Sequence, residues 1–270
     1  MTAIALTIAG SDPSGGAGIQ ADLKTFAAPG VYGASVIAAL TAQNTTGVAA
    51  IRDVPPDFIL AQMDAVFADL AVSAVKIGML SRVASVEAVA AGLARHRARN
   101  IVLDPVMAAS SGDSLLAKEA IDTLRRELIP RALIVTPNLP EAAALIGASL
   151  ARNEQEMEVQ AREILTLGAR NVLIKGGHRE GDESVDILIG QGEVVRLSAK
   201  RIATKNTHGT GCTLSSAIAA GLAKGHDLIT ATQDAKAYVT AAIAAADALH
   251  VGHGHGPLNH FYAQAHNPEK

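Results

Sequence analysis

Residues 4–28 read IALTIAGSDPSGGAGIQADLKTFAA, and they show the pattern on which the rest of the chain is built. The apolar run Ile4–Ala9 has the length of a buried strand, Gly10–Gly18 is a glycine-rich loop, and Ile19–Ala28 predicts a helix. This order is typical of a ligand site at the carboxyl end of a parallel strand. The loop lacks the Lys-Ser/Thr pair of a Walker loop and does not complete a dinucleotide fingerprint, which disfavours a dinucleotide-dependent oxidoreductase. An ordinary flexible loop is the open alternative.

The same pattern recurs along the chain. Strands are predicted at Val36–Leu40, Ala74–Ile77, Ile101–Leu103, Leu133–Val135 and Asn171–Ile174, with a hairpin at Asp186–Ile189 and Val194–Leu197. Helices are predicted at Asp57–Leu70, Ser85–Arg97, Ala117–Leu128, Ala142–Ile146, Glu154–Leu167, Thr213–Ala223 and Ile229–Leu249. Such units with short connections predict an α/β fold with an open, mostly parallel sheet and helices on both faces. Because no linker or composition break divides the sequence, we expect a single domain over residues 1–270.

Composition excludes several classes of function. The chain is 49% hydrophobic and carries a formal net charge of −3, which argues for a soluble protein that binds neither nucleic acid nor an anionic membrane surface. No apolar run approaches the roughly 20 residues of a membrane span. A single cysteine excludes an internal disulfide framework, so we expect a cytoplasmic protein.

Polar residues follow several predicted strands at the point where each strand ends. Gln43 lies in the polar stretch Thr41–Gly47, Asp104 follows a buried strand, and Lys175 ends another. Glu141 falls in a first helical turn, where the helix dipole alone would account for it. Because the carboxyl ends of parallel strands share one edge of the sheet, these groups should meet there. An acid pair for a cation and a lysine for a phosphate favour phosphoryl transfer.

The stretch Asn206–Ser216, NTHGTGCTLSS, predicts an anion-binding loop. Gly209 and Gly211 allow a sharp turn and close approach to a ligand, and the free N–H groups of the following helix favour negative charge. Cys212 stands where that field is strongest, so we expect its thiol to ionise more easily than usual. It is a candidate base or orienting group, and a small residue of the pocket wall is the alternative.

Several of these stretches resemble the hydroxymethylpyrimidine/phosphomethylpyrimidine kinases of thiamine biosynthesis, within the ribokinase-like superfamily. The resemblance spans essentially the whole chain, in order. It is carried by Ile8–Thr25, Leu40–Val48 (LTAQNTTGV), Lys76–Leu80 (KIGML), Leu103–Met107 (LDPVM), Thr136–Ala142 (TPNLPEA), Leu173–His178 (LIKGGH), Asn206–Ser216 and Val251–Pro257 (VGHGHGP).

The resemblance implies a ribokinase-like three-layer α/β/α fold with a small β-hairpin. It also implies two successive phosphoryl transfers from ATP, first to 4-amino-5-hydroxymethyl-2-methylpyrimidine and then to its monophosphate, in an enzyme that is commonly a homodimer. Carried over residue by residue, it assigns the pyrimidine to Gly10, Asp22, Gln43, Met79 and the Val106 backbone, and Mg²⁺ to Asp104 and Glu141. It assigns ATP to Asn138, Lys175 and Lys236, and the transferring phosphoryl group to the N–H groups of Gly209, Thr210, Gly211 and Cys212.

Two alternatives stay open at this stage. A pyridoxal or pyridoxine kinase shares the fold and mechanism, and the polar edge of Asp22 and Gln43 favours the aminopyrimidine instead. A nucleotide-binding regulator without catalysis is disfavoured by the intact candidate site. The chain reads Ala108–Ser111 where relatives often carry a lysine, which puts a phosphate contact from that loop in doubt. The histidines of His250–His255 alternate with glycines and are interpreted as surface residues rather than as a metal site.

Overall fold

One sheet of nine strands runs through the part of the chain that the computed structural model describes, residues 2–109, 112, 115–177, 181–190, 192 and 194–264. Its strands are β1 (Ile4–Gly10), β2 (Tyr32–Asn44), β3 (Gly47–Asp53), β4 (Ala74–Ile77), β5 (Ile101–Leu103), β6 (Ile134–Val135), β7 (Val172–Lys175), β8 (Glu183–Ile189) and β9 (Val194–Lys200). The helices are α1 (Gly18–Ala27), α2 (Pro56–Asp69), α3 (Val83–Arg95), α4 (Lys118–Glu127), α5 (Leu139–Ile146), α6 (Glu154–Leu165), α7 (Thr210–Ala223) and α8 (Leu228–Ala244), with short 3₁₀ turns at Ile129–Arg131, Ala246–Ala248 and Tyr262–Gln264.

The strand order is β3-β2-β1-β4-β5-β6-β7-β8-β9. The pairs from β2 through β1 and β4 to β7 are all parallel, whereas β3 at one edge and β8 and β9 at the other pair antiparallel. The β8–β9 pair is the predicted hairpin, and its turn residue Gln191 lies outside the described residues, as does His178. The predicted mostly parallel α/β architecture is therefore confirmed.

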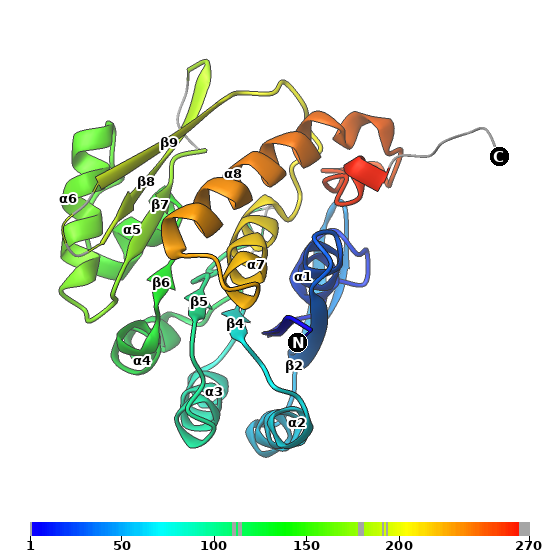
Figure 1. Cartoon of the computed structure of the whole chain (residues 1–270), viewed down its shortest axis with the longest axis vertical. Coiled ribbons are helices and arrows are strands. Elements are labelled where there is room, and N and C mark those ends of the chain that lie inside the picture. The colour runs from blue at the N-terminus through cyan, green and yellow to red at the C-terminus, as the bar shows by residue number, and fades with distance from the viewer. Residues whose placement is uncertain are drawn as a thin grey trace.

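The sheet separates two hydrophobic cores, because alternate residues of each buried strand face opposite sides. In β5, Ile101 and Leu103 belong to the core under α2 to α6, whereas Val102 belongs to the core under α1, α7 and α8. Figure 1 shows α2, α3 and α4 side by side on one face of the sheet and α7 and α8 on the other. Alanine-rich α7 and α8 pack closely on each other, and α7 packs on the central strands β1, β4 and β5, whereas α8 packs on the edge strand β9.

The stretch Thr41–Gly47 differs from the prediction. It was expected to be a loop, but β2 extends to Asn44 and turns back into β3, which the sequence pattern did not predict. The turn is closed by Asn44, whose Oδ1 accepts hydrogen bonds from the backbone N–H and the hydroxyl of Thr46. Both strands are largely exposed here, so the apolar alternation that identifies a half-buried strand is missing.

Helix ends near the strand edge follow their sequence signals. Helix α5 begins with a capping box in which the Asn138 side chain accepts from the Glu141 N–H and the Glu141 carboxylate accepts from the Asn138 N–H. Helix α7 begins at Thr210, three residues before the predicted Thr213, after Gly209 in the left-handed conformation with φ 82°.

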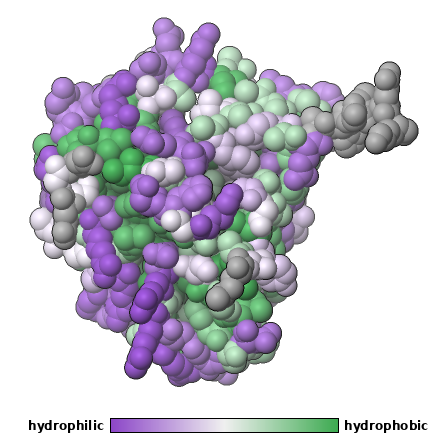
Figure 2. All heavy atoms as spheres, viewed as in Figure 1, coloured by the Kyte–Doolittle hydropathy of each residue, from purple (hydrophilic) through white to green (hydrophobic). Residues whose placement is uncertain are grey.

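Hydrophilic and hydrophobic residues are interspersed over the visible face of the molecule (Figure 2). None of the described helices is long and apolar enough to cross a membrane.

Candidate active site

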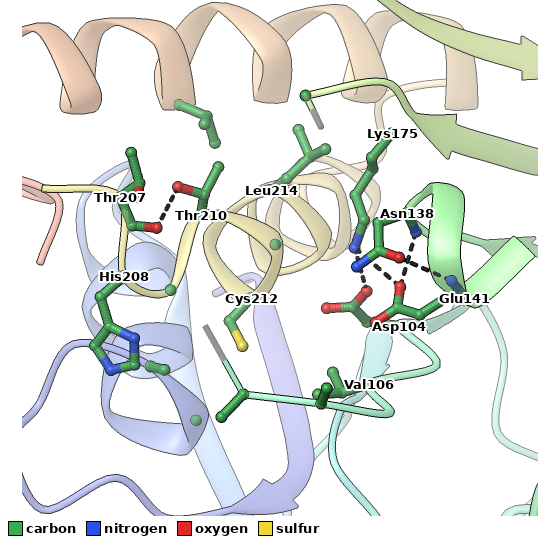
Figure 3. A pocket seen from close by; sticks show the side chains of 18 of the residues that line it. Asp104, Val106, Asn138, Glu141, Lys175, Thr207, His208, Thr210, Cys212 and Leu214 are labelled. Carbon is green, nitrogen blue, oxygen red and sulfur yellow. Dashed lines mark hydrogen bonds and ion pairs between the residues drawn. The ribbon is translucent and has the colours of Figure 1, made fainter. Parts of the chain in front are cut away.

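A cavity of about 770 Å³ opens at the carboxyl edge of the parallel strands. The predicted site residues that line it are Gly10, Gln43, Met79, Asp104, Val106, Asn138, Glu141, Lys175, Gly209, Thr210, Gly211, Cys212 and Lys236. They come from loops and elements spread over the whole chain, and the shared strand edge brings them together as expected. Figure 3 shows Cys212 between the His208 side of the cavity and the cluster of Asp104, Glu141 and Lys175.

One part of the cavity combines an apolar wall with a polar edge. Met79 packs with Ala39 and Leu115 in a small hydrophobic cluster against which Val106 lies. Gly10 stands so close to Met79 that a Cβ there would come within 2.9 Å of the methionine sulfur. The Thr41 hydroxyl, whose shorter hydrogen bond of 2.8 Å goes to the Ser11 carbonyl, lies 3.2 Å from Gln43 Oε1. The arrangement suits a flat ring with hydrogen-bonding groups on its edge.

Asp22 does not line the cavity. It is fully buried beneath the floor, where both its oxygens accept from the Lys76 ammonium at 2.8 Å. The Thr7 hydroxyl at 2.6 Å and the Ser216 hydroxyl at 2.7 Å complete its shell. The expected direct contact between Asp22 and a substrate is therefore not what this geometry offers. Lys76, which does line the cavity, is instead held in place by Asp22.

Cys212 lies in the first turn of α7, but its thiol is harder to ionise than usual. Burial is the largest influence and raises the pKa of Cys212 to about 11. The Lys76 ammonium and the Gly18 N–H favour the thiolate, whereas the carboxylates of Asp22 and Asp104 oppose it. The expectation of an easily ionised thiol is wrong because it weighed the helix dipole without the cost of desolvation.

Two carboxylates and one lysine form the opposite side of the cavity. The Lys175 ammonium lies 2.7 Å from Asp104 Oδ1 and 3.8 Å from Glu141 Oε2. Asp104 also accepts from the hydroxyls of Thr136 at 3.1 Å and Ser215 at 3.3 Å. Burial raises the pKa of Glu141 to about 7, with Lys175 opposing the shift and Asp104 adding to it. Two carboxylates that converge on one ammonium make a pair of cation ligands.

The nucleotide candidates are also held by partners. Lys236 Nζ on α8 lies 2.7 Å from Asp186 Oδ2 on β8 and donates to the Ser184 hydroxyl at 3.3 Å. Asn138 caps α5 and pairs with Lys175 through an isolated parallel bridge. Among the described residues, no group of three or more His, Cys, Asp or Glu is gathered as a metal site.

Comparison with known proteins places this geometry in a family. The family model described as phosphomethylpyrimidine kinase matches residues 12–259. The chain belongs to the phosphomethylpyrimidine kinase family. A hydroxymethylpyrimidine/phosphomethylpyrimidine kinase from Rhizobium meliloti is 60% identical over 262 residues, which cover 97% of this chain and 98% of the relative.

Solved structures agree with the fold. A pyridoxal kinase from Bacillus subtilis, determined as an ADP complex, matches with a TM-score of 0.91 and 36% identity, covering 98% of this chain and 100% of that one. A phosphomethylpyrimidine kinase from Clostridium difficile 630 matches with a TM-score of 0.78 and 46% identity, covering 88% of this chain and 97% of that one. The predicted family, fold class and kinase activity are confirmed, and the names of the relatives favour the pyrimidine kinase over the pyridoxal alternative.

Four residues at or beneath the cavity received no role from the sequence: Asp12, Lys76, Asp186 and His208. Lys76 carried a usable signal, because a lysine inside a buried strand requires an acidic partner. Its partner Asp22 is 54 residues away, and that of His208 is 196 residues away. A single sequence gives no indication of such pairings.

Proposed function

We propose that this chain transfers a phosphoryl group from ATP to the hydroxymethyl group of 4-amino-5-hydroxymethyl-2-methylpyrimidine, and then a second one to the monophosphate. The observation that carries the proposal is the convergence of three groups on one cavity. They are the N-terminus of α7 with Cys212, the cluster of Lys175, Asp104 and Glu141, and the apolar wall beside Gln43. Together they supply an anion hole, charge neutralisation and a ring pocket, which phosphoryl transfer requires.

The pyrimidine occupies the part of the cavity beside Met79. Its ring lies against the apolar cluster, and Gln43, with an amide donor and acceptor, pairs with the edge of the nitrogen heterocycle. The backbones of Gly10 and Val106 complete this contact. Asp22 acts from beneath through Lys76 and makes no contact with the ring.

The nucleotide occupies the rest of the cavity. Lys175, Lys236 and Asn138 face its phosphates, and the N–H groups of Gly209, Thr210, Gly211 and Cys212 surround the transferring phosphoryl group. The substrate hydroxyl oxygen forms a bond to the γ-phosphorus, the bond from that phosphorus to the bridging oxygen breaks, and ADP leaves. Cys212 accepts the hydroxyl proton in its thiolate form, which is the minor form near neutral pH because burial raises its pKa to about 11.

Asp104 and Glu141 fit a bound Mg²⁺. They are two carboxylates whose charges meet at one ammonium, and neighbouring negative charge contributes to the raised pKa of Glu141. A cation there would neutralise both, with phosphate oxygens and water as its other ligands. Bound Mg²⁺ supplies charge stabilisation for the transferring group.

The experiment that tests this function follows the products from the aminopyrimidine alcohol and ATP-Mg by mass spectrometry, with pyridoxal as a parallel substrate. Appearance of the monophosphate and then the diphosphate supports the proposal. Phosphorylation of pyridoxal alone would replace it with the pyridoxal kinase alternative, and no product from either alcohol would favour a non-catalytic nucleotide-binding protein. The variant Cys212→Ala should lose most of the first transfer and remain folded, whereas near-normal turnover would remove the proton-acceptor role.

We further propose that the chain works as one domain, in the cytoplasm and as a homodimer. The continuous sheet and the single cysteine support the first two points. The large apolar side chains of Tyr32, Leu40 and Phe58 are more than half exposed and would be covered by a second copy. Light scattering coupled to size-exclusion chromatography measures the oligomeric state.

A further inference from the structure

The carboxylate of Asp12 organises the glycine-rich loop after β1. Its Oδ1 accepts from the backbone N–H of Ser14 at 2.9 Å and from the Ser14 hydroxyl at 2.7 Å. Its Oδ2 accepts from the N–H groups of Gly16 at 3.2 Å and Ala17 at 2.8 Å. The side chain is 1% exposed, so these bonds are shielded from water. Asp12 therefore fixes the path of the loop that ends at α1.

The same carboxylate reaches the loop before α7. Asp12 Oδ2 also bonds to Nε2 of the buried His208 at 2.8 Å. The backbone N–H of His208 donates to the Gly256 carbonyl at 3.0 Å, and His208 forms a parallel bridge with Pro257. Three segments that are distant in the sequence thus meet at this one histidine.

The backbones of the two loops touch directly beside this pair. Gly209 has φ 82°, and a Cβ there would overlap the Gly16 carbonyl oxygen. A Cβ at Gly16 would in turn overlap the His208 ring. Neither position has room for a side chain, so the two loops are in direct contact next to the Asp12–His208 bond.

The two loops carry opposite halves of the proposed reaction. Gly209 is the N-cap of α7, whose first N–H groups receive the transferring phosphoryl group, and Gly10 at the other end of the Asp12 loop contacts the pyrimidine. Resting on the proposed function, we propose that the Asp12–His208 hydrogen bond is the positioning element that sets the anion loop against the substrate loop. His208 acts through Gly209, and Asp12 acts through Gly16 and Ala17.

The chemistry of the pair suits this task. Burial alone would raise the pKa of Asp12, but hydrogen bonds from His208, Ser14 and Ala17 lower it to about 2. Asp12 is therefore a carboxylate at any working pH, and its bond to the histidine is directional. A misplacement of reacting groups by about 1 Å can cost on the order of 100-fold in rate, so positioning of this kind is measurable.

The decisive experiment compares His208→Gln with His208→Asn, using kcat and KM for the first transfer. The glutamine amide is one methylene longer and reaches the position of Nε2, whereas the asparagine amide stops near Nδ1 and falls short of Asp12. We expect His208→Gln to keep kcat within about 3-fold of the wild type, and His208→Asn to lose about 100-fold in kcat with KM for ATP changed by less than about 3-fold. Ser14→Ala, which removes a bond to Asp12 inside its own loop, is the control and should stay near wild type.

Thermal unfolding of each variant separates positioning from folding. Equal kcat values for the glutamine and asparagine variants, both folded, would overturn the inference, and so would a loss confined to KM. If His208→Asn does not fold, Asp12→Asn, which keeps an oxygen but loses the charge, takes its place and should lower kcat about 10-fold or more. A wild-type protein that phosphorylates no alcohol would instead sink the proposed function, before any variant is compared.

Discussion

The ion pair beneath the cavity allows a test in which the two partners act oppositely on Cys212. Asp22→Asn removes a negative charge that opposes the thiolate, and Lys76→Met removes the positive charge that favours it. A neighbouring unit charge shifts a pKa by about 1 to 3 units. From its present value of about 11, the pKa of Cys212 should therefore fall to about 10 or below in Asp22→Asn. In Lys76→Met it should rise above 11.

The expected change in thiolate follows from these values. With a pKa of about 11, about one thiol in a thousand is ionised at pH 8, and a fall of one unit makes this about one in a hundred. Nucleophilicity falls with pKa, so the rate of alkylation at one pH rises only about 3-fold. The inflection of rate against pH is the direct measure. Intact-mass detection of iodoacetamide labelling gives that curve, and because the chain has one cysteine, the whole signal comes from Cys212.

The double variant Lys76→Met/Asp22→Asn is the matched control, because it removes both charges and leaves no unpaired ion below the cavity. Its inflection should lie between those of the two single variants. Inflections that move in the same direction in both single variants would refute the electrostatic account. An inflection near 9 in every variant would show that the thiol has simply become exposed, and circular dichroism would show whether the fold was lost.

Three further predictions follow from other parts of the structure. Burial lowers the pKa of His260 from 6.5 to about 4. The neutral histidine therefore contributes stability that is present above pH 6.5 and lost as the pH falls towards 4, in total about 3 kcal/mol. The free energy of unfolding, measured with urea at a series of pH values, should depend on pH differently in the wild type and in His260→Gln only within that window. Glu141→Gln keeps an oxygen that can accept from the Asn138 N–H, so α5 should stay capped while the Mg²⁺ concentration for half-maximal activity rises about 10-fold or more; an unchanged requirement would remove Glu141 from the cation site. Gly254→Ala would place a Cβ on the Thr45 carbonyl oxygen, so the C-terminal segment must separate from the β2–β3 turn. Because Gln43 lies on that hairpin, KM for the pyrimidine should rise more than KM for ATP. Equal increases in the two KM values would contradict this reasoning.

The sequence predicts the parts of this protein that depend on local pattern. The strand–loop–helix order around Gly10–Gly18, the carboxylate after β5 and the lysine that ends β7 follow from apolar runs and from where they stop. Strand β3 was missed because its exposed residues show no apolar alternation. The pKa of Cys212 was given the wrong direction because desolvation depends on tertiary burial, which a helix-dipole argument omits.

Hydrogen-bonded pairs between side chains that are far apart in the sequence could not be predicted, and these pairs hold several of the side chains that line the cavity. Among the described residues, Lys76, His208, Lys175 and Lys236 all line it, and each has an acidic partner. The partners of the first two, Asp22 and Asp12, each accept several further hydrogen bonds in near-complete burial, so the Lys76 and His208 side chains are held in place.

Lys175 and Lys236 differ from those two side chains in their exposure. Their side chains are 13% and 12% exposed, compared with 0% for Lys76 and 6% for His208. An incoming polyphosphate can compete with Asp104 and Asp186 for these two ammonium groups, whereas it cannot reach around the buried shells of the others. Basic side chains paired with carboxylates therefore fall into two groups, one shielded from a ligand and one accessible to it. The Lys76–Asp22 pair joins β4 to α1 beneath the cavity, and the proposals above assign the Asp12–His208 pair to loop positioning and Lys175 and Lys236 to the nucleotide.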